Sequence, residues 1–184
     1  GLGPGVKWLR EGDRVAVNNV VGCGICPACR AGAFTHCPTW TGAHDVNGGF
    51  GELVTAPQRN CMKLDDAVDD VTGCLLFDNV GTPFVALNRA EVGPGDDVVI
   101  SGLGPIGQAA VMLAKLRGAF VIAVDPIADR RLFAAGLGAD ATLPPDAELP
   151  AAVRALTSDL GARVVVECSG HPAAYPTAMA SLRI

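Results

Sequence analysis

The sequence predicts an α/β protein in which a parallel sheet, covered by helices on both faces, follows a smaller β-rich region. Beyond about residue 80, short apolar runs alternate with segments of helical periodicity. The runs are nearly continuous Val and Ile, as expected of strands buried on both faces. Before residue 70, candidate strands are bounded by Gly, Pro and Asp and separated by a cysteine-rich segment. We therefore expect two domains, at 1–79 and 80–184.

In the first domain, residues 14–17 and 52–55 are expected to be short strands, with an irregular lobe between them. In the second domain, the periodicity predicts four strands and three helices in alternation. The expected strands are 97–101, 120–124, 141–143 and 163–167, and the expected helices are 105–117, 129–137 and 149–160.

Composition excludes several classes of function. The net charge of −5 argues against sequence-independent nucleic-acid binding, which needs a clustered basic surface. No apolar run reaches the length of a membrane span, and no signal peptide is visible. We expect a cytoplasmic protein that binds neither nucleic acid nor membrane.

Four of the seven cysteines form a cluster with the spacing Cys-x2-Cys-x2-Cys-x7-Cys. Four thiolates at such separations can close a tetrahedron around Zn²⁺ and leave no position for water, so the predicted site is structural. An iron–sulfur cluster or a pair of disulfides is the alternative. The expected ligands are Cys23, Cys26, Cys29 and Cys37, in a lobe at 23–37. We interpret Cys61, Cys74 and Cys168 as small buried apolar residues.

A second motif, Gly102-Leu103-Gly104-Pro105-Ile106-Gly107, fits G-x-G-x-x-G. It follows a predicted strand and opens a predicted helix, and Asp125 follows at about the expected separation of roughly 20 residues. Gly102 would allow the tight turn, Gly104 the approach of a diphosphate, and Gly107 close packing of helix on strand. The helix N-terminus would supply N–H groups to the phosphates. The alternative is a glycine turn without a ligand, together with a strand-end Asp125 that only caps a helix.

Asp125 favours NAD over NADP. Its carboxylate can accept hydrogen bonds from the adenosine ribose and would repel a 2′-phosphate. Arg130 and Arg131, a few residues further on, weaken this preference because they could pair with that phosphate.

The lobe and the glycine motif, in this order, resemble the medium-chain dehydrogenase/reductase family, the zinc-containing alcohol and polyol dehydrogenases. Further strings carry the resemblance: Gly12-Asp13-Arg14-Val15, Gly48-Gly49-Phe50-Gly51-Glu52, Pro94-Gly95-Asp96 and Glu167-Cys168-Ser169-Gly170. The resemblance implies a Rossmann-type, doubly wound parallel sheet joined to a GroES-like domain, each present in part.

The resemblance also implies roles for residues that their own chemistry leaves open. Asp78 stands where the family places a ligand of the catalytic zinc, and a carboxylate is a competent ligand. Thr82 and Ile106 match residues at the nicotinamide. Arg130 matches a basic residue at the adenosine ribose, and Pro105 and Ser169 belong to motifs beside the cofactor. The alternative to these roles is structural. Asp78 would then be a helix-breaking polar residue, and Thr82, Ile106 and Arg130 would be ordinary helix or core residues.

The implied activity is hydride transfer between NAD and an alcohol, aldehyde or ketone, with a second, catalytic zinc, in a homodimer or homotetramer. The family's upstream cysteine and Gly-His-Glu segment are absent from this sequence, which also contains four of six expected strands. We therefore expect a fragment that is inactive by itself, with its fourth strand at an unpaired sheet edge. The alternatives are a zinc-free NADPH-dependent quinone or enoyl reductase and a non-catalytic nucleotide-binding scaffold.

Overall fold

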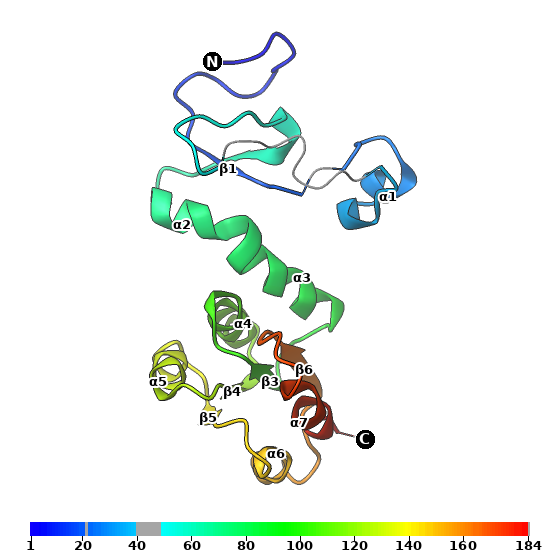
Figure 1. Cartoon of the computed structure of the whole chain (residues 1–184), viewed down its shortest axis with the longest axis vertical. Helices are drawn as coiled ribbons and strands as arrows, with labels where there is room; N and C mark the ends of the chain where they lie inside the picture. Colours follow the sequence, from blue (N-terminus) through cyan, green and yellow to red (C-terminus); the bar gives the residue numbers. More distant parts are fainter. Residues whose placement is uncertain (21, 40–48, 184) are drawn as a thin grey trace. The chain divides into compact units, whose positions relative to one another are not determined.

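The computed structural model describes residues 1–20, 22–39 and 49–183, which form two compact units, Gly1–Asp78 and Asn79–Ile184 (Figure 1). The first unit contains two strands, β1 (Val15–Val17) and β2 (Cys61–Lys63), which pair antiparallel with Ala16 opposite Met62. Its helical segments are short: α1 (Pro27–Arg30), η1 (Phe34–His36), η3 (Gln58–Asn60) and α2 (Asp70–Leu75). The π-helical segment η4 (Leu76–Val80) follows α2 in the chain.

The second unit is a four-stranded parallel sheet with strand order β5-β4-β3-β6. The strands are β3 (Asp97–Ser101), β4 (Phe120–Val124), β5 (Ala141–Leu143) and β6 (Val164–Glu167). The helices are α3 (Gly81–Arg89), α4 (Pro105–Leu116), α5 (Ala128–Gly136), α6 (Leu149–Leu156) and α7 (Ala174–Ala180). This order confirms the predicted partial, doubly wound Rossmann-type sheet.

Alternate residues of the strands enter two separate cores, as the pleat of a sheet dictates. Val98 and Ile100 point toward α3, α4 and α5, whereas Val99 points toward α6. All three side chains are fully buried. Each face of the sheet is therefore covered, which explains why its strands are apolar without alternation.

Several predicted elements differ from the structure. Residues 52–55 are not a strand: only Thr55 takes part in a β-bridge, and the Leu53 side chain is exposed. The helix predicted at 149–160 ends at Leu156, because the Thr157 hydroxyl donates to Val153 O and accepts from Gly161 N, which turns the chain. Cys74 is exposed and Cys168 is half-buried, so of the three isolated cysteines only Cys61 is buried as expected.

Within the part of the chain that the structure describes, β6 lies at the edge of the sheet, and one parallel bridge joins Ala162, just before the strand, to Leu182. Among the described residues, every helix is too short or too polar to cross a membrane.

Candidate functional site: a nucleotide cavity and a cysteine lobe

A cavity of about 520 Å³ lies at the carboxyl ends of β3, β4 and β6. In an open parallel sheet this edge, where the strand order reverses, is where ligands bind. Five residues predicted at the nucleotide line the cavity or its wall: Gly102, Gly104, Asp125, Arg130 and Ser169. Pro105 lines a neighbouring hollow instead, together with Gly104, Gln108 and Arg130.

The three glycines of the turn have different environments. Gly102 has φ +88°, and a Cβ there would lie 2.5 Å from Ser169 N. A Cβ on Gly107 would lie 1.9 Å from Gly102 O, so only glycine lets α4 pack this closely on the end of β3. A Cβ on Gly104 would meet nothing within 4 Å, although Gly104 lines the cavity. The protein's own packing therefore requires glycine at 102 and 107, and Gly104 borders open space.

The N-terminus of α4 is free to bind an anion. Gly104 is its N-cap and provides no side-chain cap, and Pro105 follows at the first helical position. The first N–H groups of a helix have no partner within the helix and carry its positive dipole. A diphosphate at Gly104 would satisfy both features.

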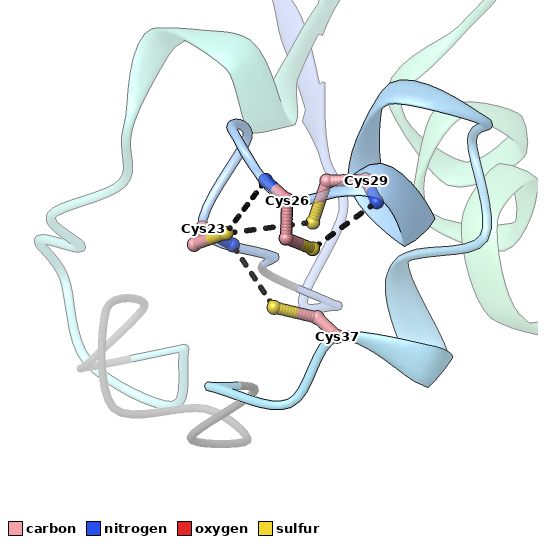
Figure 2. Close-up of side chains that lie close together, drawn as sticks. All are labelled: Cys23, Cys26, Cys29 and Cys37. Atoms are coloured by element: carbon pink, nitrogen blue, oxygen red, sulfur yellow. Dashed lines mark hydrogen bonds between the residues drawn. The ribbon is translucent and has the colours of Figure 1, made fainter.

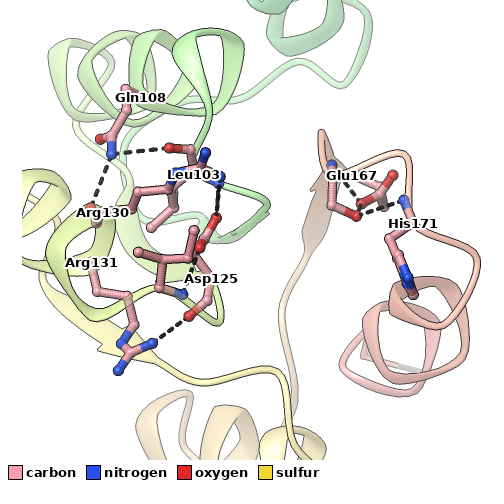
Figure 3. A network of polar contacts seen from close by, with 9 residues as sticks. Leu103, Gln108, Asp125, Arg130, Arg131, Glu167 and His171 are labelled. Carbon is pink, nitrogen blue, oxygen red and sulfur yellow. Dashed lines mark hydrogen bonds and ion pairs between the residues drawn. The ribbon is translucent and has the colours of Figure 1, made fainter.

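Contacts within the chain hold Asp125 in place, as Figure 3 shows. Its side chain is 3% exposed; Oδ2 accepts from Leu103 N at 2.7 Å and Oδ1 from Ile127 N at 2.8 Å. Arg130 Nη1 lies 3.6 Å from Oδ2, whereas Arg131 Nη1 donates to the backbone O of Asp125. A carboxylate offers about four acceptor positions, so the two backbone N–H groups leave part of its capacity for ribose hydroxyls and for Arg130.

The loop after β6 forms the opposite wall of the cavity. Glu167 Oε1 accepts from Ser169 N at 2.8 Å and from the Ser169 hydroxyl, and Oε2 accepts from Gly170 N at 3.2 Å. The Ser169 hydroxyl in turn accepts from His171 N at 3.1 Å. Burial raises the pKa of the Cys168 thiol to about 11, so this cysteine is a poor nucleophile.

Sequence reasoning missed much of the cavity lining. The missed residues are Ser101, Val124, Pro126, Pro145, Cys168, His171, Ala173 and Ala174. A signal was available, because most of them lie at or just beyond the carboxyl end of a predicted strand, and parallel strands end at one edge. Ile106 and Thr82 are not among the lining residues; Ile106 is half-buried in α4 and Thr82 is exposed on α3.

The cysteine lobe belongs to the first unit. The four sulfur atoms of Cys23, Cys26, Cys29 and Cys37 all lie within 4.8 Å of one another, and none is in a disulfide (Figure 2). Zinc bound tetrahedrally at about 2.3 Å would hold sulfurs roughly 3.8 Å apart, so a small contraction of the cluster would suffice. The donor set and its geometry therefore fit a structural zinc ion. His36 is exposed in η1, as expected of a residue that is no ligand.

Backbone N–H groups of the lobe donate hydrogen bonds to the cysteine sulfur atoms. Cys26 is the N-cap of α1, and its Sγ accepts from Cys29 N at 3.4 Å. Cys26 N donates to Cys23 Sγ at 3.3 Å, and Cys23 N to Cys37 Sγ at 3.4 Å. Such N–H···S bonds stabilise thiolates, and the backbone N–H groups of Ile25 and Cys26 lower the pKa of Cys23 to about 6.

Cys29 and Cys37 are both buried, and Cys29 differs in the direction of its pKa shift. Burial raises the pKa of its thiol to about 12. A Cβ on Gly22 would lie 2.5 Å from Cys29 Sγ, so glycine at 22 gives this sulfur its space. Cys29 therefore depends most on a metal ion for its deprotonation.

Asp78 is exposed in the π-helical segment η4, at the end of the first unit. π-Helical turns are rare and often found at functional sites. Trp40, His44 and Asn47, the polar and aromatic residues after the lobe, lie outside the described residues, as does Gly48 of the Gly-Gly-Phe string.

Comparison with known proteins places the two regions in one family. Residues 1–66 match the alcohol dehydrogenase GroES-like domain, and residues 105–184 match the zinc-binding dehydrogenase domain. The chain is 36% identical to the uncharacterized zinc-type alcohol dehydrogenase-like protein YphC of Escherichia coli, covering 98% of this chain and 52% of that protein. It is 32% identical to the sorbitol dehydrogenase of Bacillus subtilis, covering 99% and 52% respectively.

Solved structures of alcohol dehydrogenases have a fold similar to that of this chain. The chain resembles an NAD-dependent alcohol dehydrogenase with a TM-score of 0.87 and 30% identity, over 99% of this chain and 54% of that one. It resembles the alcohol dehydrogenase of Aeropyrum pernix with a TM-score of 0.85 and 30% identity, over 99% and 55%. The fold and site thus define a Rossmann-type unit with a GroES-like, zinc-lobe unit. The chain belongs to the medium-chain dehydrogenase/reductase family, with zinc-type alcohol dehydrogenases as its relatives, and spans about half the length of those curated relatives.

Proposed function

We propose that this chain provides the dinucleotide-binding unit and the structural zinc lobe of an oxidoreductase that transfers hydride between an alcohol or polyol and NAD. One observation carries the proposal. Gly104, at the uncapped N-terminus of α4, borders open space at the wall of the cavity that Asp125 also lines. A diphosphate and its adenosine ribose are the groups that this pair recognises.

Different residues of the chain would bind different parts of the dinucleotide. The N–H groups at the start of α4 would bind the diphosphate, with Pro105 fixing the first turn of the helix. Asp125 would accept from the ribose hydroxyls with its remaining lone pairs, and half-exposed Arg130 would lie beside the same sugar. Ser169, held by Glu167, would contact the cofactor from the opposite wall.

We propose NAD rather than NADP because the Asp125 carboxylate is buried and fixed by two backbone N–H groups. A 2′-phosphate placed against it would meet a desolvated negative charge. Arg130 is already paired with this carboxylate and so offers less to a phosphate.

Two zinc sites are part of the proposal. Cys23, Cys26, Cys29 and Cys37 would hold the structural ion, which fixes the lobe. Asp78 would be one ligand of a catalytic ion that, when bound, polarises the alcohol oxygen. Thr82 and Ile106 would fix the nicotinamide, as the resemblance implies. Relatives named as sorbitol and alcohol dehydrogenases support a small alcohol, polyol or carbonyl compound as substrate, and we propose a homodimer or homotetramer.

Titration of the chain with NADH, followed by the change in nicotinamide fluorescence, tests the nucleotide site. We expect saturable binding of NADH, at least tenfold tighter than NADPH, because of Asp125. Tighter binding of NADPH would favour the quinone or enoyl reductase alternative, and binding of neither would remove the proposal.

Turnover is tested in the full-length protein with a panel of alcohols and polyols, by NADH absorbance. We expect Asp78→Asn to lower kcat and to reduce the zinc content by one ion per chain, since a neutral amide is a weaker ligand. An unchanged zinc content and kcat would show that Asp78 is a helix residue only. NADH binding without turnover of any alcohol would favour the scaffold alternative.

The structural zinc is tested by metal analysis of purified chain. We expect one tightly held zinc ion in the lobe, lost in Cys26→Ser, because three thiolates leave the tetrahedron open. Cys74→Ser is the matched control, since Cys74 is exposed and apart from the cluster. Iron or acid-labile sulfide in the wild-type chain would contradict the zinc assignment.

A further inference from the structure

Gln108 joins the glycine turn to helix α5. It lies three residues after Pro105 in α4, and its Nε2 donates to Leu103 O at 3.3 Å and to Arg130 O at 3.0 Å (Figure 3). A single amide group thus links the turn after β3 to the segment that carries Arg130.

Both backbone polar groups of Leu103 form hydrogen bonds with side chains. Its N–H donates to Asp125 Oδ2 at 2.7 Å, and its C=O accepts from Gln108. Leu103 is also 1% exposed, so its side chain anchors the same residue in the core. The two peptide groups on either side of Leu103 are therefore fixed in orientation.

The hydrogen bond from Gln108 to Leu103 O determines the direction of the Gly104 N–H group. The peptide between Leu103 and Gly104 is trans, since the chain contains no cis bond in its described residues. In a planar trans peptide, C=O and N–H point in opposite directions. With its oxygen turned to Gln108, this peptide points the Gly104 N–H away from Gln108. Gly104 borders both the 520 Å³ cavity and the neighbouring hollow, whereas Gln108 borders only the hollow, so the direction away from Gln108 is the direction of the cavity.

We infer that Gln108 is a positioning residue, which aims the Gly104 N–H at the dinucleotide's diphosphate and ties the Arg130 segment to the same turn. The inference rests on the proposed function and adds a residue that touches no part of the ligand. Gln108 acts through the backbone, so its loss should affect the diphosphate more than the adenosine.

The environment of Gln108 provides a variant that keeps the fold. Its Oε1 is buried and has no hydrogen-bond partner within the described part of the chain. A buried acceptor without a partner costs free energy, and Met has a similar shape without polar atoms. Met also removes the two hydrogen bonds that Gln108 donates, which the removal of the unpartnered acceptor offsets in part. We therefore expect Gln108→Met to lower the melting temperature by only a few degrees. Leu116→Met is the control, because it changes an exposed residue at the far end of the same helix.

The test measures the affinity of the chain for ADP-ribose, which carries the diphosphate, and for adenosine, which does not. Loss of one positioning hydrogen bond corresponds to about a fivefold effect. We expect Gln108→Met to weaken ADP-ribose about fivefold and adenosine less than twofold. Gln108→Glu should weaken ADP-ribose further, since a carboxylate cannot donate to two carbonyls. In the ligand-free chain, amide exchange at ¹⁵N-labelled Gly104 should change in Gln108→Met and not in Leu116→Met.

The outcomes separate the two claims. Unchanged ADP-ribose binding in Gln108→Met, or equal loss of both ligands, would overturn the inference and leave the proposed function standing. Failure of the wild-type chain to bind ADP-ribose at all would overturn the proposed function, and the inference with it.

Discussion

At the scale of single residues, two glycines of the turn serve packing within the protein and the third borders the proposed ligand site. Gly102 and Gly107 are fixed by contacts with the protein's own backbone, whereas Gly104 faces open space. Gly104 also has φ −72°, which any L-residue can adopt, so its own conformation does not require glycine. Substitutions at 104 and 107 should therefore have opposite effects on stability and binding.

We expect Gly104→Ala to keep the melting temperature of the wild type and to weaken NADH at least tenfold, since its methyl group would occupy the space of the diphosphate. Gly107→Ala should lower stability by about 1–3 kcal/mol or more, because its Cβ would lie 1.9 Å from Gly102 O. Thermal unfolding and NADH titration of both variants provide the measurement. Equal NADH affinity in Gly104→Ala and wild type would contradict the diphosphate assignment.

The sequence could identify the residues of the turn but not their contacts. G-x-G-x-x-G in its context predicted which glycines matter, because backbone approach leaves no other residue type. It could not predict that Asp125 holds Leu103 N, or that Gln108 holds Leu103 O, since these pairings join residues from different elements. Thr82 and Ile106 remain predictions from family resemblance.

At the scale of elements, the start of β5 is tied to α4 by a partly buried ion pair. Asp140 Oδ2 accepts from Lys115 Nζ and from Val121 N, both at 2.7 Å. Burial alone would raise the pKa of Asp140, but these hydrogen bonds outweigh it and lower the pKa below its ordinary value of 3.8. A carboxyl with a lowered pKa stabilises the fold above its unfolded-state pKa, and this contribution is lost as the pH falls below about 3.8.

We expect Asp140→Asn to lower the stability by about 1–2 kcal/mol at pH 7, because the charge-assisted bond to Lys115 is lost. The difference from wild type should shrink between about pH 4 and pH 2.5. Urea unfolding at both ends of this range measures it, with Asp129→Asn, exposed on α5, as control. A difference that stays constant with pH would show that the pair contributes no ionic stabilisation.

Elements of the second unit were largely predictable, whereas in the first unit the strand predicted at 14–17 is found at Val15–Val17 and the one predicted at 52–55 is not found. The strands at 97–101 and 120–124 match the structure because burial on both faces makes their central residues apolar, and the partly buried strand at 141–143 matches as well. Residues 52–55, Glu-Leu-Val-Thr, form no strand, and residues 61–63 form one that was not predicted. Short strands of three residues carry too little periodicity to be distinguished from loops.

At the scale of the whole chain, each unit has its own proposed ligand. The sulfur cluster lies in Gly1–Asp78, and the nucleotide cavity is lined by residues of Asn79–Ile184. A ligand that binds only the folded state stabilises what it contacts, by about 2.7 kcal/mol at one hundred times its Kd.

We therefore expect zinc and NADH to protect different parts of the chain in hydrogen exchange. Removal of zinc with a chelator should increase exchange in the 23–37 lobe, and NADH should decrease it around the 102–107 turn and after β6. Protection of the turn by zinc, with no effect of NADH, would contradict this division. The wild-type chain without either ligand is the reference for both.

The hydrogen bond from Leu103 N to Asp125 is a contact within the chain itself, so folding fixes the shape of the turn. Its ordering entropy is spent during folding, and binding begins from a nearly final shape. The heat-capacity change of association should accordingly match the apolar area that the ligand covers, without the extra share that coupled folding adds.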